Sequence, residues 1–148
     1  MKTAIFPGSF DPFTIGHAAI VERGLSLFDR IVIGVGKNES KRSLYSAEER
    51  VKAISELYAD NPQVKVVGYD DLTIDLARRE GAQFILRGIR SVKDFEYERE
   101  QADINRQLGG VETILLFSDP RYSSISSTLV RELIFFGREV DEFLPKAK

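Results

Sequence analysis

The sequence predicts an α/β domain built on a doubly wound, five-stranded parallel sheet. Two observations carry this prediction: five short apolar runs recur along the chain, and amphipathic stretches with helical spacing separate them. The runs are continuous rather than alternating, which is typical of strands covered on both faces. Strand–helix alternation with right-handed crossovers then gives a parallel sheet. Because no internal repeat or linker interrupts the pattern, we expect a single domain over residues 1–148.

The apolar runs are the expected strands. We end the first strand at Phe6, because Pro7 lacks a backbone N–H and Gly8 favours a turn. The third run is the weakest, which favours a position near an edge of the sheet. In chain order, the expected strands are 3–6, 30–35, 64–67, 83–87 and 113–117.

The expected helices lie between the strands and after the last one. Apolar residues of each stretch fall on one face of a helix. Ser46-Ala47-Glu48-Glu49 is a capping-box pattern that starts the second helix, and Gly81 and Gly137 are expected to end the third and fifth. In chain order, the expected helices are 17–28, 46–58, 72–80, 94–108, and a fifth that starts at 126 or 127.

Composition excludes several classes of protein. The chain is 43% apolar and 30% charged, as in an ordinary globular protein, and its formal charge of −2 argues against general nucleic-acid binding. It has no cysteine, which excludes a disulfide framework and a thiolate metal site. No apolar run approaches about 18–20 residues and a strand begins near the N-terminus, so we expect no membrane span and no signal peptide. These features are consistent with a cytoplasmic protein.

Polar and glycine residues follow each expected strand, at the end where a parallel sheet binds ligands. The largest such group follows the first strand and ends at Gly16-His17, which opens a helix. The N–H groups and partial positive charge of a helix N-terminus suit phosphate oxygens, and a histidine there can add a hydrogen bond. The alternative is a turn capped by Asp11 or Thr14, with a structural histidine beside it.

The string Gly8-Ser9-Phe10-Asp11-Pro12, followed by Thr14-Ile15-Gly16-His17, resembles the T/H-x-G-H signature of the nucleotidyltransferase superfamily, which has a Rossmann-like fold. Threonine in the first place is similar to the bacterial-type phosphopantetheine adenylyltransferase family, whereas several related families carry histidine there. The resemblance implies that His17 stabilises the transition state, that Ser9, Phe10 and His17 contact ATP, and that Ser9 also contacts the acceptor substrate.

Two basic groups follow later strands. The run 37–42 is either a solvated loop or an arm that brings ammonium groups to phosphates, and the resemblance assigns substrate binding to Lys41. Arg87-Gly88-Ile89-Arg90 follows the fourth strand, and arginine favours bidentate contact with phosphate. The alternative is a pair of surface salt bridges. The resemblance implies that Arg87 binds the acceptor phosphate, and that ATP contacts Gly88, Ile89, Arg90 and Glu98.

The last motif is a hydroxyl-rich run at the start of the fifth helix. Such residues cap helices, and the helix start can also bind an anion. The run resembles the C-terminal signature of nucleotidyltransferases. The resemblance also assigns acceptor binding to Thr73, a position where the family can carry a larger apolar residue. The implied ATP contacts here are Ser123, Ser124, Ile125, Ser126, Ser127, Thr128 and Leu129.

The resemblance implies reversible transfer of an adenylyl group from ATP to 4′-phosphopantetheine, which gives dephospho-coenzyme A and pyrophosphate. The attacking phosphate is already anionic, so His17 acts as a donor rather than as a base. Mg²⁺ is expected to accompany ATP, without a metal site made by the protein. The family further implies feedback by coenzyme A and a homohexamer.

Three other functions remain open. The chain could use nicotinamide mononucleotide or glycerol phosphate as the acceptor, although Thr14 and the block from Arg87 to Glu98 argue against both. It could be a non-catalytic nucleotide-sensing domain, although His17, Lys41 and Arg87 are all present. It could also be an interaction protein that uses the apolar run 133–136.

Overall fold

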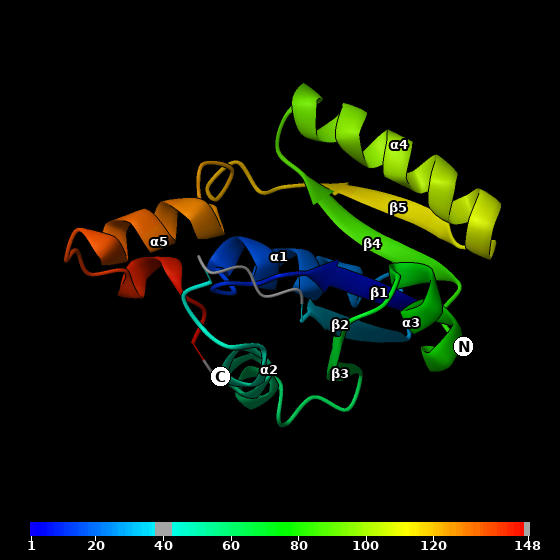
Figure 1. Ribbon diagram of the computed structural model, residues 1–148, viewed down its shortest axis with the longest axis horizontal. Helices are drawn as coiled ribbons and strands as arrows, with labels where there is room; N and C mark the ends of the chain where they lie inside the picture. Colours follow the sequence, from blue (N-terminus) through cyan, green and yellow to red (C-terminus); the bar gives the residue numbers. More distant parts are fainter. Residues whose placement is uncertain (38–42, 147–148) are drawn as a thin grey trace.

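The computed structural model describes residues 1–37 and 43–146. Their five strands form one parallel sheet in the order β3-β2-β1-β4-β5, with helices on both faces (Figure 1). This confirms the predicted doubly wound fold, and β3 lies at an edge of the sheet as its weak apolar run indicated. The strands are β1 (Thr3–Gly8), β2 (Arg30–Gly36), β3 (Val64–Tyr69), β4 (Phe84–Ile89) and β5 (Glu112–Phe117).

The helices agree with the predicted ones except at their ends. The first begins earlier than predicted, because Thr14 is its N-cap. The fourth also begins earlier, because the Ser91 side chain accepts a hydrogen bond from the Asp94 N–H. The helices are α1 (Ile15–Gly24), α2 (Ala47–Leu57), α3 (Thr73–Glu80), α4 (Val92–Gly109) and α5 (Ser127–Phe135), with a 3₁₀ turn η1 (Asp141–Phe143) after them.

The first strand extends two residues beyond its predicted end, to include Pro7 and Gly8. β1 pairs with β2 along its whole length, but with β4 only at Ala4 and Ile5. The Pro7 carbonyl accepts a bond from a β4 side chain, that of Arg87, so the side of Pro7 that lacks an N–H faces β4. Pro7 therefore sits where ladder pairing with β4 has already stopped, and it can remain in the strand.

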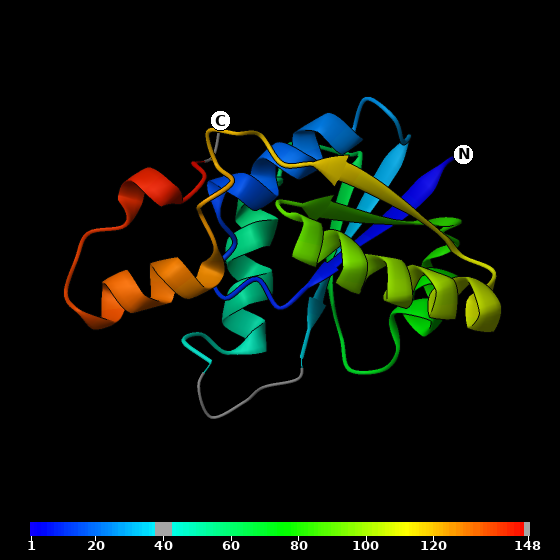
Figure 2. The same ribbon diagram turned by 90° about the horizontal axis from the view of Figure 1, so that it is seen from above.

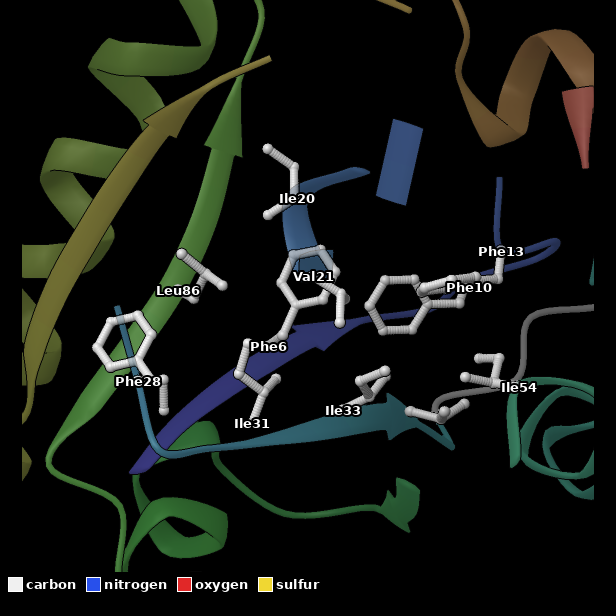
Figure 3. Close-up of a cluster of buried hydrophobic side chains, with 12 residues drawn as sticks. Phe6, Phe10, Phe13, Ile20, Val21, Phe28, Ile31, Ile33, Ile54 and Leu86 are labelled. Atoms are coloured by element: carbon white, nitrogen blue, oxygen red, sulfur yellow. The ribbon is translucent and has the colours of Figure 1, made fainter. Parts of the chain in front are cut away.

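Two hydrophobic clusters fill the two faces of the sheet. Figure 3 shows the larger one, in which Phe6, Ile31 and Leu86 of the sheet pack against Val21 of α1. On the opposite face, Ile5 and other strand residues pack against α3. Alternate residues of β1 thus enter different clusters, which is the pattern of a strand that is buried on both sides.

The last helix lies apart from the sheet faces. Both views place α5 at the end of the molecule opposite the N-terminus (Figures 1 and 2). In the described part of the chain, no helix combines the length and the apolar character needed to cross a membrane.

Candidate active site

A cavity of about 370 Å³ opens where β1 and β4 part. These two central strands pair only near their starts, and the chain leaves them toward opposite edges of the sheet. Such a switch in strand order leaves a crevice at the carboxyl ends of the strands, which is where ligands bind in this kind of sheet. The cavity is lined by residues 6–10, Thr14, Gly16, His17, Ile20, Arg87, Gly88, Arg90, Asp94, Glu98, Ser118, Tyr122, residues 125–128 and Arg131.

His17 is held in one orientation by the start of α1. The Thr14 N–H donates to Nδ1 of His17 at 2.9 Å, and the His17 N–H donates to the Thr14 hydroxyl oxygen at 3.4 Å. Because Nδ1 accepts a backbone hydrogen bond, the proton of the neutral imidazole is on Nε2. The helix cap therefore selects the tautomer whose remaining ring nitrogen is a donor.

The surroundings of His17 also keep it neutral. Burial, together with the positive charges of Arg87 and Arg90, lowers the pKa of His17 to about 4. Aromatic side chains bury the imidazole: the ring centres of Phe10 and Phe13 lie 5.0 and 5.3 Å from the centre of the His17 ring. A histidine with this pKa is a poor base near neutral pH, but its Nε2–H can donate to an anion.

Arg87 is fixed by the residues around it. Its Nε and Nη2 donate to the two carboxylate oxygens of Glu98 at 2.9 and 2.8 Å, and its Nη1 donates to the Pro7 carbonyl at 2.7 Å. The Glu98 carboxylate is buried, whereas 30% of the Arg87 side chain is exposed. A guanidinium has five N–H groups, so Arg87 keeps donors for a ligand while its orientation is set.

Arg90 is more open than Arg87. Its backbone N–H donates to the Asp94 carboxylate at 3.0 Å, and its Nε lies 3.4 Å from the same oxygen. Between the two arginines, Gly88 allows β4 to pack closely on α1, since a side chain at this position would meet Ile20 at 2.9 Å. The end of β4 therefore lies close to α1, and Gly88 lines the cavity between the two arginines.

The start of α5 forms the opposite side of the cavity. The Ser126 hydroxyl caps this helix by accepting from the Leu129 N–H, and the Ser127 hydroxyl donates to the Pro12 carbonyl at 2.7 Å. Arg131 follows one turn later and also lines the cavity. A helix N-terminus with hydroxyl groups and an arginine is suited to bind phosphate oxygens.

Most of the predicted site residues lie together in this cavity. Sequence reasoning did not assign Arg131, Asp94 or Tyr122 to the site, although Arg131 stands four residues after Ser127 and shares its helix face. The predicted residues that line the cavity are Ser9, Phe10, His17, Arg87, Gly88, Arg90, Glu98, Ile125, Ser126, Ser127 and Thr128.

The other predicted site residues that the structure describes do not line this cavity. Lys41 falls outside the described residues. Ile89 and Ser123 line a neighbouring pocket that shares Arg90 with the cavity. Thr73 is the first residue of α3, and its hydroxyl is 3.0 Å from the hydroxyl of Tyr69, the last residue of β3. Ser124 and Leu129 line neither pocket. The roles of these residues stay predictions.

The acidic residues of the cavity are paired with arginines rather than with one another. Glu98 binds Arg87, and Asp94 binds Arg90. Within residues 1–37 and 43–146, no group of three or more histidine or acidic side chains could hold a metal ion. These residues therefore offer no metal cage made by the protein alone.

Comparison with known proteins agrees with the fold and with the motifs. The model of the cytidylyltransferase-like family matches residues 5–133. A bifunctional NMN adenylyltransferase/ADP ribose pyrophosphatase from Francisella tularensis has the same fold, with a TM-score of 0.74 and 17% identity. The superposition covers 99% of this chain and 46% of that one. At this identity the likeness concerns the fold alone.

Curated relatives are similar over nearly their whole length. Phosphopantetheine adenylyltransferase from Phocaeicola vulgatus is 60% identical over 99% of this chain and 97% of its own. Phosphopantetheine adenylyltransferase from Flavobacterium johnsoniae is 48% identical with the same coverage. The chain therefore belongs to the phosphopantetheine adenylyltransferase family, and it is a nucleotidyltransferase enzyme.

Proposed function

We propose that this enzyme transfers the AMP part of ATP to the phosphate of 4′-phosphopantetheine, and that it forms dephospho-coenzyme A and pyrophosphate reversibly. The observation that carries the proposal is the convergence of the His17 donor, Arg87 and Arg90 at the gap between β1 and β4. Relatives up to 60% identical that bear the name of this activity support the same substrates.

The reaction is an in-line substitution at phosphorus. A phosphate oxygen of the acceptor attacks the α-phosphorus of ATP, and a new P–O bond forms. The bond between the α-phosphorus and the oxygen that bridges to the β-phosphorus breaks, and pyrophosphate leaves with that electron pair. Because the nucleophile is already anionic, no proton has to be removed. Catalysis then consists of positioning and charge stabilisation.

The residues of the cavity supply both. His17 donates its Nε2–H to the charge that develops on the α-phosphate. Arg87, held by Glu98, binds the attacking phosphate with its remaining N–H groups, and Lys41 assists it. Arg90 and the start of α5 bind the nucleotide phosphates. Mg²⁺ enters with ATP as part of the substrate, bound to phosphate oxygens and water, since Asp94 and Glu98 are paired with arginines.

The assembly and its regulation belong to the same proposal. We expect a homohexamer in the cytoplasm, with coenzyme A as a feedback ligand. Large apolar side chains exposed on α4 support self-association, since monomers rarely expose many of them together. Those with at least 43% of their surface exposed are Val92, Phe95, Tyr97, Ile104 and Leu108. Light scattering coupled to size exclusion tests the assembly.

A pyrophosphate-release assay with three acceptors tests the proposed reaction. Wild-type enzyme is mixed with Mg·ATP and, in separate reactions, with 4′-phosphopantetheine, nicotinamide mononucleotide or glycerol phosphate. A reaction without acceptor measures background hydrolysis. We expect rapid release with phosphopantetheine alone, with dephospho-coenzyme A identified by its mass. Release only with one of the other two acceptors would overturn the substrate assignment.

A further inference from the structure

Arg50, near the start of α2, is buried and has no ionic partner among residues 1–37 and 43–146. Its exposed fraction is 3%, the lowest of any arginine in the described part of the chain. None of the ion pairs among those residues includes Arg50, and its Nη2 has no hydrogen-bond partner. A buried charge with no counter-charge is unfavourable. Other groups must therefore stabilise the Arg50 guanidinium.

The guanidinium of Arg50 binds three backbone carbonyls instead. Its Nη1 donates to the carbonyls of Ser9 at 2.5 Å and Gly36 at 3.1 Å, and its Nε donates to that of Tyr45 at 3.2 Å. The three acceptors belong to the turn after β1, the end of β2 and the residues before α2. Hydrogen bonds from a charged donor are stronger than neutral ones. One side chain therefore ties three neighbouring segments together.

The turn after β1 requires such restraint. Phe10 has a φ of 50°, in the left-handed region that is unfavourable for residues other than glycine. The Asp11 carboxylate accepts bonds from the Leu44 and Tyr45 N–H groups at 2.7 and 2.9 Å, and the Asp11 carbonyl accepts one from Arg131 at 2.8 Å. The turn is thus held from the α2 side and from α5.

Arg50 acts on the cavity without entering it. Ser9 lines the cavity, whereas Arg50 does not. Since the Ser9 carbonyl is bonded to Arg50, this oxygen points away from the space where phosphates would bind. A carbonyl oxygen turned into that space would repel phosphate oxygens, because both are acceptors.

We infer that Arg50 is a positioning residue for the phosphates of ATP. It holds the Ser9–Phe10 turn with its carbonyl outward, so that the cavity side of the turn can accept anions. The inference rests on the proposed function, because it takes the triphosphate as the ligand of this cavity. It concerns binding and orientation, and it gives Arg50 no contact with the reacting atoms.

Kinetics of Arg50→Lys test this role. Lysine keeps the charge, but a single ammonium cannot reach three carbonyls as a planar fork does. We expect the KM for Mg·ATP to rise at least about tenfold, which is the change in affinity that corresponds to the loss of one hydrogen bond from a charged group. The KM for the acceptor should rise less than that for Mg·ATP, since Arg87 and Glu98 are untouched and only Ser9 is shared between the two substrates. Lys52→Gln, at an exposed position of the same helix, is the matched control and should leave both KM values unchanged.

The ratio of the two KM values and the value of kcat separate positioning from a merely structural role. Assays are run at a temperature well below the thermal unfolding midpoint of each variant, so that only folded enzyme is compared. If folded Arg50→Lys has both KM values and kcat within about twofold of wild type, the inference is wrong. An equal rise in both KM values would also contradict it.

A measurement on the wild-type protein covers the case in which the lysine variant does not fold. The Arg50 Nε–H signal in a ¹⁵N NMR spectrum reports its bond to Tyr45. We expect added inorganic pyrophosphate to shift this signal, although Arg50 lies outside the cavity. No shift at a pyrophosphate concentration that saturates the signals of Ser9 and His17 overturns the inference. Failure of wild type to turn over phosphopantetheine would instead count against the proposed function.

Discussion

His17 serves both the fold and the chemistry of the cavity. Its Nδ1 accepts the backbone N–H of Thr14 and so completes the capping box of α1. That hydrogen bond leaves Nε2–H as the only ring donor, and burial among Phe10 and Phe13 keeps the ring neutral. The sequence predicts a donor at this position from its motif, whereas the tautomer follows only from the geometry of the cap.

Substitution of His17 is expected to reduce turnover more than binding. His17→Ala removes the donor to the α-phosphate, and we expect kcat to fall about 10²–10³-fold. ATP affinity, measured by calorimetry, should stay within a few-fold of wild type because Arg90 and the start of α5 are intact. His17→Gln keeps an N–H donor and should retain more activity than the alanine variant. Near-normal turnover by His17→Ala would exclude the assigned role.

The geometry of Glu98 predicts an effect on the acceptor rather than on ATP. Both of its carboxylate oxygens are bonded to Arg87. Glu98→Gln breaks one arm of this pair, and we expect the KM for phosphopantetheine to rise about tenfold, as for loss of a charged hydrogen bond. Glu96→Gln, at an exposed position of the same helix, is the control. If Glu98→Gln changed the KM for ATP alone, Glu98 would bind the nucleotide directly, as the family resemblance implies.

At the scale of elements, the cavity depends on where strands end and helices begin. β1 and β4 pair only at Ala4 and Ile5, and the space beyond them receives the starts of α1 and α5. Each of these helices is capped by a hydroxyl side chain, from Thr14 and Ser126. Capping therefore contributes to stability and also aims N–H groups at the cavity.

Two serine caps with the same geometry separate these contributions. Ser126 caps α5 beside the cavity and Ser46 caps α2, and each hydroxyl accepts its N–H at 3.1 Å. Each alanine variant should lose about 1 kcal/mol of unfolding free energy, measured by urea denaturation. Only Ser126→Ala should also raise the KM for ATP, because Ser46 does not line the cavity. Equal kinetic effects of the two variants would contradict a binding role for the start of α5.

The strands and helices themselves were predictable from sequence, but the contacts between them were not. Continuous apolar runs located all five strands, and the capping box at Ser46 located the start of α2. The extension of β1 through Pro7 was missed, because it depends on β4 having already separated. Arg50 shows the same limit: its partners Ser9 and Gly36 are brought to it by the fold, and a buried arginine in a charged helix has no local signal.

Across the whole molecule, one titrating group links the cavity to stability. Folding lowers the pKa of His17 from 6.5 to about 4. Above pH 6.5 the imidazole is neutral in both the folded and the unfolded chain, and this stability is fully present. As the pH falls below 6.5 the unfolded chain takes up a proton that the folded chain does not, so stability is lost progressively down to about pH 4.

The pH dependence of unfolding measures this linkage. Between pH 7.5 and 5, we expect wild type to lose about 2 kcal/mol more unfolding free energy than His17→Gln, because the glutamine side chain does not titrate and the two proteins share all their other titrating groups. Urea denaturation of both proteins at several pH values gives the difference. Parallel curves for the two proteins would mean that His17 has an ordinary pKa in the folded chain.

We expect the cavity to work with a neutral histidine that donates through Nε2. The chain contains one histidine, so a ¹⁵N NMR titration of the imidazole can be read without assignment ambiguity. From pH 8 to 5 we expect Nε2 to keep the shift of a protonated nitrogen and Nδ1 that of an unprotonated acceptor, with no titration step near 6.5. A step near pH 6.5, or a proton on Nδ1, would show that His17 is not a neutral Nε2–H donor.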